Sequence, residues 1–357
     1  MTFVLSVKDT YRQAVEAATD GKNTVMYDAK GNPSIMVCIP RFNLSDVITG
    51  APNTPHPAFI VNGVVISEIW ISKFQNIVQD NLAYSLPGQD PKTYVTYDQA
   101  KSYCTAKGPG WHLMTNAEWA ALALWAKKNG TMPRGNNQFG SDVSAPYEHG
   151  REASKDGNRT GRILTGSGPA SWSHDGTNAG VFDLNGNVWE WVDGLKLLDG
   201  KIYVHQDNNF GTAESTGKAD GWVDTGVYFD NSTAGDATTT DHDVGGDPIL
   251  SDSRTNPMYT GNASSNPYYG YSYTTFETLA AKSGFSVPDL LKYLAVAPVD
   301  ANHGGDGLWI RNYGERLPIR GGNWSSGSNA GVFYLSLNNP RSSADSNVGF
   351  RSAYVAL

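Results

Sequence analysis

Cysteine, clustered positive charge and long apolar runs are all scarce in this chain of 357 residues. Cys38 and Cys104 are its two cysteines and form no Cys-x-x-Cys pattern, which favours two reduced, mostly buried thiols over a disulfide or a metal site. Lys and Arg number 27 against 35 Asp and Glu, and they form no cluster that could neutralise phosphates. The composition therefore argues against a nucleic-acid partner.

Membrane-spanning and export signals are also missing. No apolar run approaches the roughly 20 residues that cross a bilayer, and the stretch from Ala58 to Trp70 is interrupted by polar residues such as Asn62 and Glu68. The start, Met1 to Asp9, lacks the basic region of a signal peptide and soon becomes amphipathic. We expect no transmembrane segment, and synthesis in the cytoplasm without a signal peptide.

Glycine and large aromatic residues are abundant instead. The chain contains 39 Gly, 18 Tyr and 10 Trp, which predicts many turns and short strands around an aromatic-rich core. Its length suits two average domains or one elaborated domain. From about residue 205 to about residue 300 the sequence becomes polar and rich in Gly, Asn, Thr and Tyr, as in an insertion on a core.

Helix and turn signals are clear at a few places. Capping patterns predict helices that begin after Asp9, Thr96 and Thr115, and the last of these ends at Gly130. A shorter late helix is expected over Asp289 to Ala295. The run Val61-Asn62-Gly63-Val64 predicts a hairpin.

Near the carboxyl end, apolar and polar residues alternate. Phe333, Leu335 and Leu337 alternate with Tyr334, Ser336 and Asn338. This period predicts a strand with one face in the core and the other facing water.

Common catalytic frames are missing from the sequence. We find no Gly-x-Ser-x-Gly elbow, phosphate-binding loop, His-Glu-x-x-His or dinucleotide fingerprint. Seven histidines are scattered, and each is expected to be a loop residue or a satisfied buried one. The run Asp241-His242-Asp243 could hold a cation, but a solvated loop is the simpler interpretation.

Three runs together carry a family resemblance. They are Gly110 to Trp119 (GWHLMTNAEW), Leu184 to Trp191 (LNGNVWEW), and Arg320-Gly321-Gly322-Asn323-Trp324 followed by Gly349-Phe350-Arg351. In this order and spacing they resemble the formylglycine-generating-enzyme (sulfatase-modifying factor) branch of the C-type lectin fold. The resemblance implies an α+β fold, with residues 1–357 as a single elaborated domain, a long irregular insertion at 205–300 and a distinct C-terminal segment at 320–357.

Within that branch the chain is most similar to the variable proteins of diversity-generating retroelements. In these proteins the last segment is rewritten by an error-prone reverse transcriptase that acts at template adenines. Serine, Asp and Tyr are all reached from the Asn codon AAC by changing adenines only. The resemblance implies that 320–357 is a variable ligand-binding segment, whose expected ligand-binding residues are Asn323, Ser325, Ser326, Ser328, Tyr334, Ser336, Asn338, Ser343, Asp345 and Ser346.

The same resemblance bears on whether the protein is an enzyme. Catalytic members carry a cysteine pair after the Arg-Gly-Gly run, where it binds copper and oxidises a substrate cysteine. Residues 320–357 contain no cysteine, and thiolates are the soft ligands that Cu(I) needs. We therefore expect no copper and no enzyme activity. A copper-dependent oxidase of the formylglycine-generating type is the alternative, and a purely structural virion component is a third possibility.

Calcium-binding members suggest one further site. They use a carboxylate or amide, two backbone carbonyls and a glutamate, which correspond to Asp183, Gly186, Val188 and Glu190 here. Such hard oxygen ligands suit a structural Ca²⁺. A tight turn whose Asp and Glu only cap or pair is an equally good interpretation.

The sequence thus leads to a hypothesis of non-catalytic recognition. We expect the C-terminal face to bind a protein or glycan on a cell surface, with Tyr334 and Ser336 displayed outward. The sequence leaves open the identity of the ligand, the oligomeric state, and whether the protein is virion-associated, as in a phage tail, or cytoplasmic.

Overall fold

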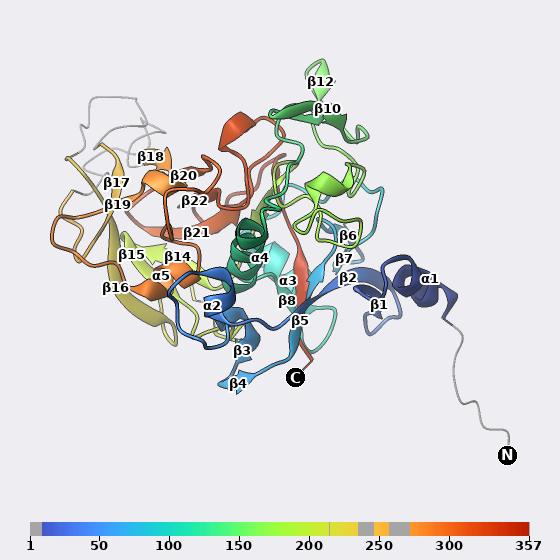
Figure 1. The fold of residues 1–357 in the computed structure, drawn as a ribbon, viewed down its shortest axis with the longest axis horizontal. Helices are drawn as coiled ribbons and strands as arrows, with labels where there is room; N and C mark the ends of the chain where they lie inside the picture. The colour runs from blue at the N-terminus through green and yellow to red at the C-terminus, as the bar shows by residue number, and fades with distance from the viewer. Residues whose placement is uncertain (1–8, 214, 235–245, 257–271, 357) are drawn as a thin grey trace.

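The computed structural model describes residues 9–213, 215–234, 246–256 and 272–356, whose arrangement is shown in Figure 1. The expectations for the start of the chain and for Asp241-His242-Asp243 fall outside these residues. Helix α4 (Asn116–Asn129) lies near the middle of the picture, with strands on both sides of it. Two sheets, of five and of eleven strands, contain most of the strands.

Helices α3 (Tyr97–Thr105) and α4 begin where the sequence places their capping residues. Thr96 and Thr115 each accept a hydrogen bond from the backbone three residues later, and the residue there completes a capping box. Gly130 ends α4 in left-handed backbone with a φ of 69°. Both helices are confirmed, because their boundaries depend on local hydrogen bonds that the sequence specifies directly.

The other helices are shorter. Asp9 caps α1 (Thr10–Ala18) by accepting a hydrogen bond from the backbone of Arg12, as expected. The late helix α5 (Asp289–Tyr293) forms but ends two residues before the expected boundary, and α2 (Leu44–Val47) is a single turn. Among the helices that the structure describes, none combines the length and apolar composition needed to cross a bilayer.

The smaller sheet joins the two ends of the chain. Its order is β1 (Asn23–Tyr27), β2 (Pro33–Pro40), β5 (Glu68–Ser72), β24 (Ser352–Tyr354) and β8 (Trp111–Leu113). The last strand, β24, is inserted between β5 and β8, where Ala353 pairs with Ile71 on one side and with His112 on the other. The C-terminal segment is therefore held between strands from the first third of the chain.

The larger sheet carries the C-terminal segment and the segment 205–300 together. Its main path is β18 (Ser272–Thr275), β20 (Gly307–Ile310), β22 (Leu335–Asn339), β21 (Glu315–Arg320), β14 (Leu195–Leu198), β15 (Lys201–Val204), β16 (Val223–Asn231), β17 (Pro248–Ser251) and β19 (Ala280–Ala281). Strand β13 (Trp189–Trp191) pairs with β21 and with β23 (Val348–Phe350). Strands β16 to β19 thus extend the sheet that contains β22.

The remaining strands of the described residues form short hairpins. Asn62 and Gly63 connect β3 (Ile60–Val61) to β4 (Val64–Val65) with φ values of 50° and 76°, which confirms the expected hairpin. The other short strands are β6 (Ile77–Gln79), β7 (Leu82–Tyr84), β9 (Ser141–Asp142), β10 (Ala145–His149), β11 (Lys155–Asp156) and β12 (Arg159–Thr160). Four 3-10 turns occur at Pro57–Phe59, Ala170–Trp172, Phe276–Thr278 and Gly327–Asn329.

One hydrophobic core connects the two sheets through α4. Side chains of α4, Ile71 of the smaller sheet and Leu335 and Leu337 of the larger sheet belong to the same buried cluster. The indole N–H of Trp119 in α4 also donates to the carbonyl of Val332, at 2.7 Å, next to β22. Each such buried side chain stabilises the fold by roughly 1.5–3 kcal/mol, so the C-terminal segment is part of the central core.

Strand β22 is buried on both faces, which corrects one expectation. Phe333, Leu335 and Leu337 are fully buried, as the alternation predicts. However, Tyr334 is 3% exposed and Ser336 4% exposed, so the expectation that these two side chains face water is wrong. The reason is tertiary, because Trp189 of β13 packs against the ring of Tyr334 and Trp309 of β20 lies opposite Ser336.

Candidate functional site

A groove of about 440 Å³ opens where β13, β20 and β22 meet the chain segment 340–347. Four of the ten expected ligand-binding residues line it, namely Ser336, Asn338, Ser343 and Asp345. Ser346 is adjacent to the lining and donates its hydroxyl to Asp345 at 3.2 Å. We call this feature the C-terminal groove.

The wall of the C-terminal groove is built from aromatic residues. Trp189 and Trp309 both line it. The buried ring of Tyr334 packs against Trp189, with ring centroids 4.3 Å apart, and its hydroxyl accepts a hydrogen bond of 2.6 Å from the indole N–H of Trp309. Tyr334 therefore supports the two tryptophans from beneath and is not itself displayed.

The segment 340–347 is held in place mainly by its backbone and by one arginine. The carbonyl of Asp345 accepts a hydrogen bond from the backbone N–H of Tyr94, at 2.9 Å. Arg341 forms an ion pair with Glu315, with Nε and Oε2 3.0 Å apart. Because these contacts fix the main chain, the side chains at the rim can change without altering its course.

Asn338 offers an unused acceptor inside the C-terminal groove. Its side-chain oxygen Oδ1 is buried and has no hydrogen-bond partner among the described residues. A buried acceptor without a partner costs roughly 1–3 kcal/mol, so a hydrogen-bond donor from outside the protein that displaced the atoms covering Oδ1 would recover this energy. Asp345, by contrast, is exposed and presents its carboxylate at the rim.

The remaining expected residues lie in the loop after β21. Asn323 is buried, and its Oδ1 accepts hydrogen bonds from the backbone N–H and hydroxyl of Ser325, at 3.0 and 3.1 Å, and from the hydroxyl of Ser326, at 2.9 Å. Asn323 thus organises the turn. Ser325 and Ser328 are exposed and are the displayed members of this loop.

Ser328 lines a separate cavity of about 260 Å³. Asp306 lies in the same lining, and its Oδ2 accepts a hydrogen bond of 2.7 Å from the backbone N–H of Phe333. Burial raises the pKa of Asp306 to about 8. The displayed positions therefore do not share one strand face: Ser328 lines this cavity, whereas Ser343 and Asp345 line the C-terminal groove.

Tyr273 connects these two parts of the site. Its hydroxyl donates to Oδ1 of Asn329, at 3.1 Å, in the turn that follows Ser328. Its ring packs against Trp309, with centroids 4.4 Å apart, at the C-terminal groove. Tyr273 belongs to the segment 205–300, so this segment contributes directly to the support of the site.

Several lining residues were not anticipated from the sequence. Trp189, Trp309, Asn339 and Asn347 line the C-terminal groove. Trp189 lies in the aromatic run that carried the resemblance, and this run was a usable signal. No sequence signal pointed to Trp309, because it reaches the groove only through the parallel pairing of β20 with β22, in which it is opposite Ser336.

The four positions expected to hold calcium do converge. The backbone oxygens of Asp183, Gly186 and Val188 and a carboxylate oxygen of Glu190 all face one point. That point is the position of the side-chain nitrogen Nε2 of Gln75, which is within 3.5 Å of each of the four oxygens. The expected cation position therefore contains a protein amide.

The two cysteines lie outside the lining of the C-terminal groove, although Cys104 belongs to the same buried cluster as Trp189 and Tyr334. Cys38 lies on β2 and Cys104 is buried in α3, and both are free thiols. Burial raises the pKa of Cys104, and it raises that of Cys38 to about 12, with Glu68 as a further cause. Neither thiol lines the C-terminal groove.

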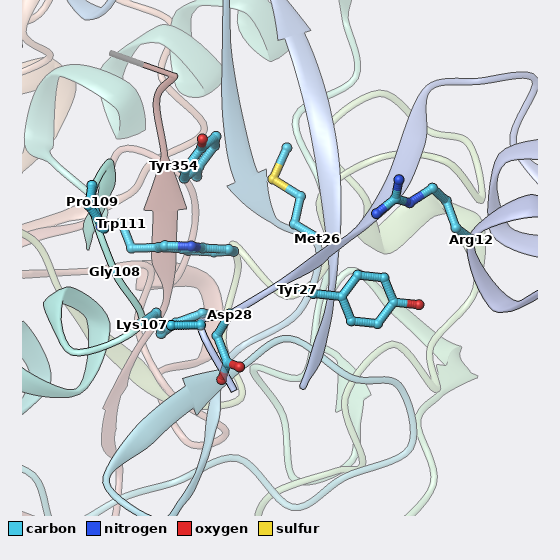
Figure 2. A pocket seen from close by; sticks show the side chains of 10 residues that line it. Arg12, Met26, Tyr27, Asp28, Lys107, Gly108, Pro109, Trp111 and Tyr354 are labelled. Carbon is cyan, nitrogen blue, oxygen red and sulfur yellow. The ribbon is translucent and has the colours of Figure 1, made fainter. Parts of the chain in front are cut away.

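Another cavity, of about 430 Å³, is lined by residues of β1, β8 and β24 of the smaller sheet and is shown in Figure 2. Arg12, Trp111 and Tyr354 are among its lining residues. The ammonium of Lys107 is 3.6 Å from the ring centroid of Trp111 and donates to the hydroxyl of Ser34 at 2.6 Å. Burial lowers the pKa of Lys107 to about 7. No expected ligand-binding residue lines this cavity, so we treat it as separate from the site.

Comparison with solved structures finds matches of low sequence identity that align over nearly the whole chain. PvdO from Pseudomonas aeruginosa is 14% identical, with 93% of this chain and 97% of that chain covered and a TM-score of 0.36. Treponema denticola variable protein 1 is also 14% identical, with 93% and 98% covered and a TM-score of 0.35. A U1 variant of the Major Tropism Determinant is 12% identical, with 90% and 62% covered and a TM-score of 0.29.

Among curated proteins, no sequence matches this one. A family model described as the sulfatase-modifying factor enzyme 1-like domain matches residues 19–221. The match covers more than half of the chain and includes α3, α4 and the Leu184 to Trp191 run, but of the residues that line the C-terminal groove it includes only Trp189. The chain therefore belongs to the family of sulfatase-modifying factor enzyme 1-like domains, and the expected α+β, C-type lectin fold of the formylglycine-generating-enzyme type is confirmed.

Proposed function

We propose that this protein is a non-catalytic recognition protein that binds a cell-surface protein or glycan through the C-terminal groove. We further propose that it is a variable protein of a diversity-generating retroelement, with 320–357 as the diversified segment. The observation that carries the proposal is the groove itself. It places the unpartnered oxygen of Asn338 beside Ser343 and Asp345 on a segment whose main chain is fixed.

The chemistry of the lining suits adaptable recognition. Hydroxyl, amide and carboxylate groups both donate and accept hydrogen bonds, and the two tryptophans provide rigid contact area. The residues that support them, Tyr334 and Asn323, make their hydrogen bonds inside the protein. Folding and recognition are thus assigned to different side chains, although both kinds occur in the same segment.

The distribution of cysteine supports recognition over oxidation. The catalytic alternative needs two thiolates near the site, and the chain has only Cys38 and Cys104, neither of which is in 320–357. Both thiols have raised pKa values, so the reactive thiolate form is disfavoured at neutral pH.

Binding can be tested with purified protein on an array of bacterial surface glycans and recombinant surface-protein ectodomains. We expect the wild type to bind members of one class in a saturable manner. The double variant Asn338→Ala/Asp345→Ala should bind at least tenfold more weakly, since each residue contributes roughly one net hydrogen bond, at about 0.5–1.5 kcal/mol for a neutral group and more for a charged one.

The matched control is Asn129→Ala/Asp220→Ala, which removes the same two groups from exposed positions outside the C-terminal groove. Its binding should equal that of the wild type. The proposal would be contradicted if the wild type bound neither the glycans nor the ectodomains on the array. It would also be contradicted if the control variant lost as much affinity as the groove variant.

Diversification has a separate test in the neighbouring DNA. We expect a near-copy of the segment encoding 320–357 that differs at adenines, next to a reverse transcriptase gene. Purified virions and cytoplasmic fractions, probed with an antibody, would then show whether the protein travels on a phage tail or stays in a cell. A genome without such a copy would remove the retroelement from the proposal and leave recognition to the binding test.

A further inference from the structure

The run Asp183 to Glu190 folds around the side-chain amide of a residue more than 100 positions earlier. The Nε2 group of Gln75 donates to the carbonyl of Val188 at 2.9 Å and to Glu190 Oε1 at 3.1 Å. It is also 3.2 Å from the carbonyl oxygen of Asp183 and 3.5 Å from that of Gly186. Gln75 is completely buried, so no solvent competes for these contacts.

The orientation of this amide is determined by its surroundings. The backbone N–H of Ile163 can only donate, and it donates to Oδ1 of Asn187 at 2.8 Å. The Nδ2 group of Asn187 then donates to Oε1 of Gln75 at 2.8 Å. Because Oε1 is occupied in this way, the NH₂ end of Gln75 faces the four oxygens, whereas the reverse orientation would place five oxygens together.

The charge of Glu190 is already neutralised. Arg351 forms a bidentate pair with its carboxylate, with Nε 2.6 Å from Oε2 and Nη2 2.5 Å from Oε1, and both side chains are buried. The same Nη2 group also donates to the carbonyl of Phe182 at 3.0 Å. A divalent cation at the Gln75 position would therefore lie beside a guanidinium that cannot lose its proton.

The carboxylate of Asp183, which was also expected to bind the cation, does not point to the position of Gln75 Nε2. The carboxylate of Asp183 accepts a hydrogen bond of 3.0 Å at Oδ2 from the backbone N–H of Gly166, and its Oδ1 is buried without a partner among the described residues. Asp183 contributes only its backbone oxygen to the group around Gln75. Calcium prefers 6–8 oxygen ligands with several carboxylates, and here three neutral carbonyls and one paired carboxylate are present. These residues do not fit a bound Ca²⁺.

We propose that the amide of Gln75 takes the place of a structural cation, so that the aromatic run Leu184 to Trp191 is held without calcium. The two N–H groups of Gln75 donate to the two nearest of the inward-facing oxygens, those of Val188 and Glu190, and Arg351 supplies the positive charge. This inference is independent of the proposed recognition function, because it concerns residues outside the C-terminal groove.

The first experiment measures the wild-type protein directly. Purified full-length protein is unfolded in chelator, refolded, and divided between 1 mM CaCl₂ and 1 mM EGTA (roughly the upper range for extracellular calcium sites). We expect the same melting temperature in both, and less than one-tenth of an equivalent of calcium by mass spectrometry. Stoichiometric calcium, or a melting temperature several degrees higher in calcium, would overturn the proposal.

The second experiment replaces the amide by a carboxylate. Gln75→Glu puts an anion among the four oxygens, so we expect its melting temperature to fall in EGTA and to recover partly in calcium. Gln13→Glu makes the same chemical change at an exposed position of α1 and should respond to neither. A Gln75→Glu protein as stable as the wild type in EGTA would show that the amide donor is not required.

If Gln75→Glu does not fold in EGTA, the refolding yield becomes the readout. The yield should rise with added CaCl₂ for this variant and stay constant for the wild type. If the refolding yields of the wild type and of Gln75→Glu rose equally with calcium, a metal ion and not the amide of Gln75 would hold these oxygens.

Discussion

The group around Gln75 and the C-terminal groove are both built from polar residues, but they treat their polar atoms differently. Around Gln75 the carbonyl of Val188 and the carboxylate of Glu190 accept hydrogen bonds from within the protein, and this carboxylate is also paired with Arg351. In the C-terminal groove Asn338 has an oxygen without a partner, and Asp345 faces solvent. A satisfied polar network stabilises one structure, whereas an open one is available for binding.

The comparison also explains why the expected display residues do not behave alike. Tyr334 and Asn323 belong to the satisfied class, because each makes hydrogen bonds inside the protein. Ser325, Ser328, Asn338 and Asp345 belong to the open class. Substitutions should therefore affect stability or binding according to class, whatever their position in the segment.

The largest effect is expected at the buried ion pair. Arg351→Met leaves the Glu190 carboxylate buried without its partner, which should lower the free energy of unfolding by about 3–5 kcal/mol. Urea unfolding followed by tryptophan fluorescence measures this loss. Lys292→Met, which breaks an ion pair with the exposed Asp289, should change it by less than about 1 kcal/mol.

A loss of about 3 kcal/mol is expected for Tyr334→Ala, because this change removes the ring packed on Trp189 and leaves the Trp309 N–H without its acceptor. The same urea titration measures it. Ser325→Ala, in the open class, should stay within about 0.5 kcal/mol of the wild type. Equal tolerance at both positions would contradict the assignment of Tyr334 to the supporting frame.

Acid should destabilise the fold through a buried histidine that lies outside both regions. His56 accepts a hydrogen bond from the backbone N–H of Ala58 at Nδ1, and its Nε2 donates to the carbonyl of Tyr293 at 2.9 Å. Burial lowers the pKa of His56 from 6.5 to about 4. Between these two pH values the unfolded chain binds a proton that the folded protein does not, so stability falls as the pH drops through this window.

We expect His56→Gln to remove roughly 2 kcal/mol of the stability difference between pH 7 and pH 4. His149→Gln, at an exposed position, should leave the pH dependence as it is. Melting temperatures recorded across pH 4–7 compare the three proteins. A pH profile that His56→Gln does not flatten would show that protonation of this histidine is not coupled to unfolding.

The smallest effect on stability is expected in the C-terminal groove. Asn338→Ala and Asp345→Ala should each change the free energy of unfolding by less than about 0.5 kcal/mol, even though together they abolish most of the expected binding. Removal of the unpartnered acceptor of Asn338 should be neutral or slightly stabilising. If either substitution lowered the free energy of unfolding by more than about 2 kcal/mol, these residues would belong with the buried residues that support the fold.

The sequence predicted the local elements well. Thr96, Thr115 and Gly130 specified where α3 and α4 begin and end, and Asn62-Gly63 specified a hairpin, because each depends on hydrogen bonds within a few residues. The candidate site was predicted only in part. Ser336, Asn338, Ser343 and Asp345 do line one groove, but the outward orientation of Tyr334 and Ser336 was wrong.

The alternation along 333–338 could not distinguish a half-buried strand from one covered on its second face. That cover comes from Trp189 and Trp309, which reach β22 from different parts of the chain. The partner of the oxygens at 183–190 was equally hidden, because Gln75 precedes them by more than 100 residues.

By itself, the sequence determined the helix boundaries, the tight turns and the family, since these depend on short runs of residues whose chemistry acts locally. Only the tertiary structure decided which polar side chains are satisfied and which remain open to a ligand. The physical reason is that satisfaction depends on donors and acceptors brought together from distant parts of the chain by the packing of two sheets around α4.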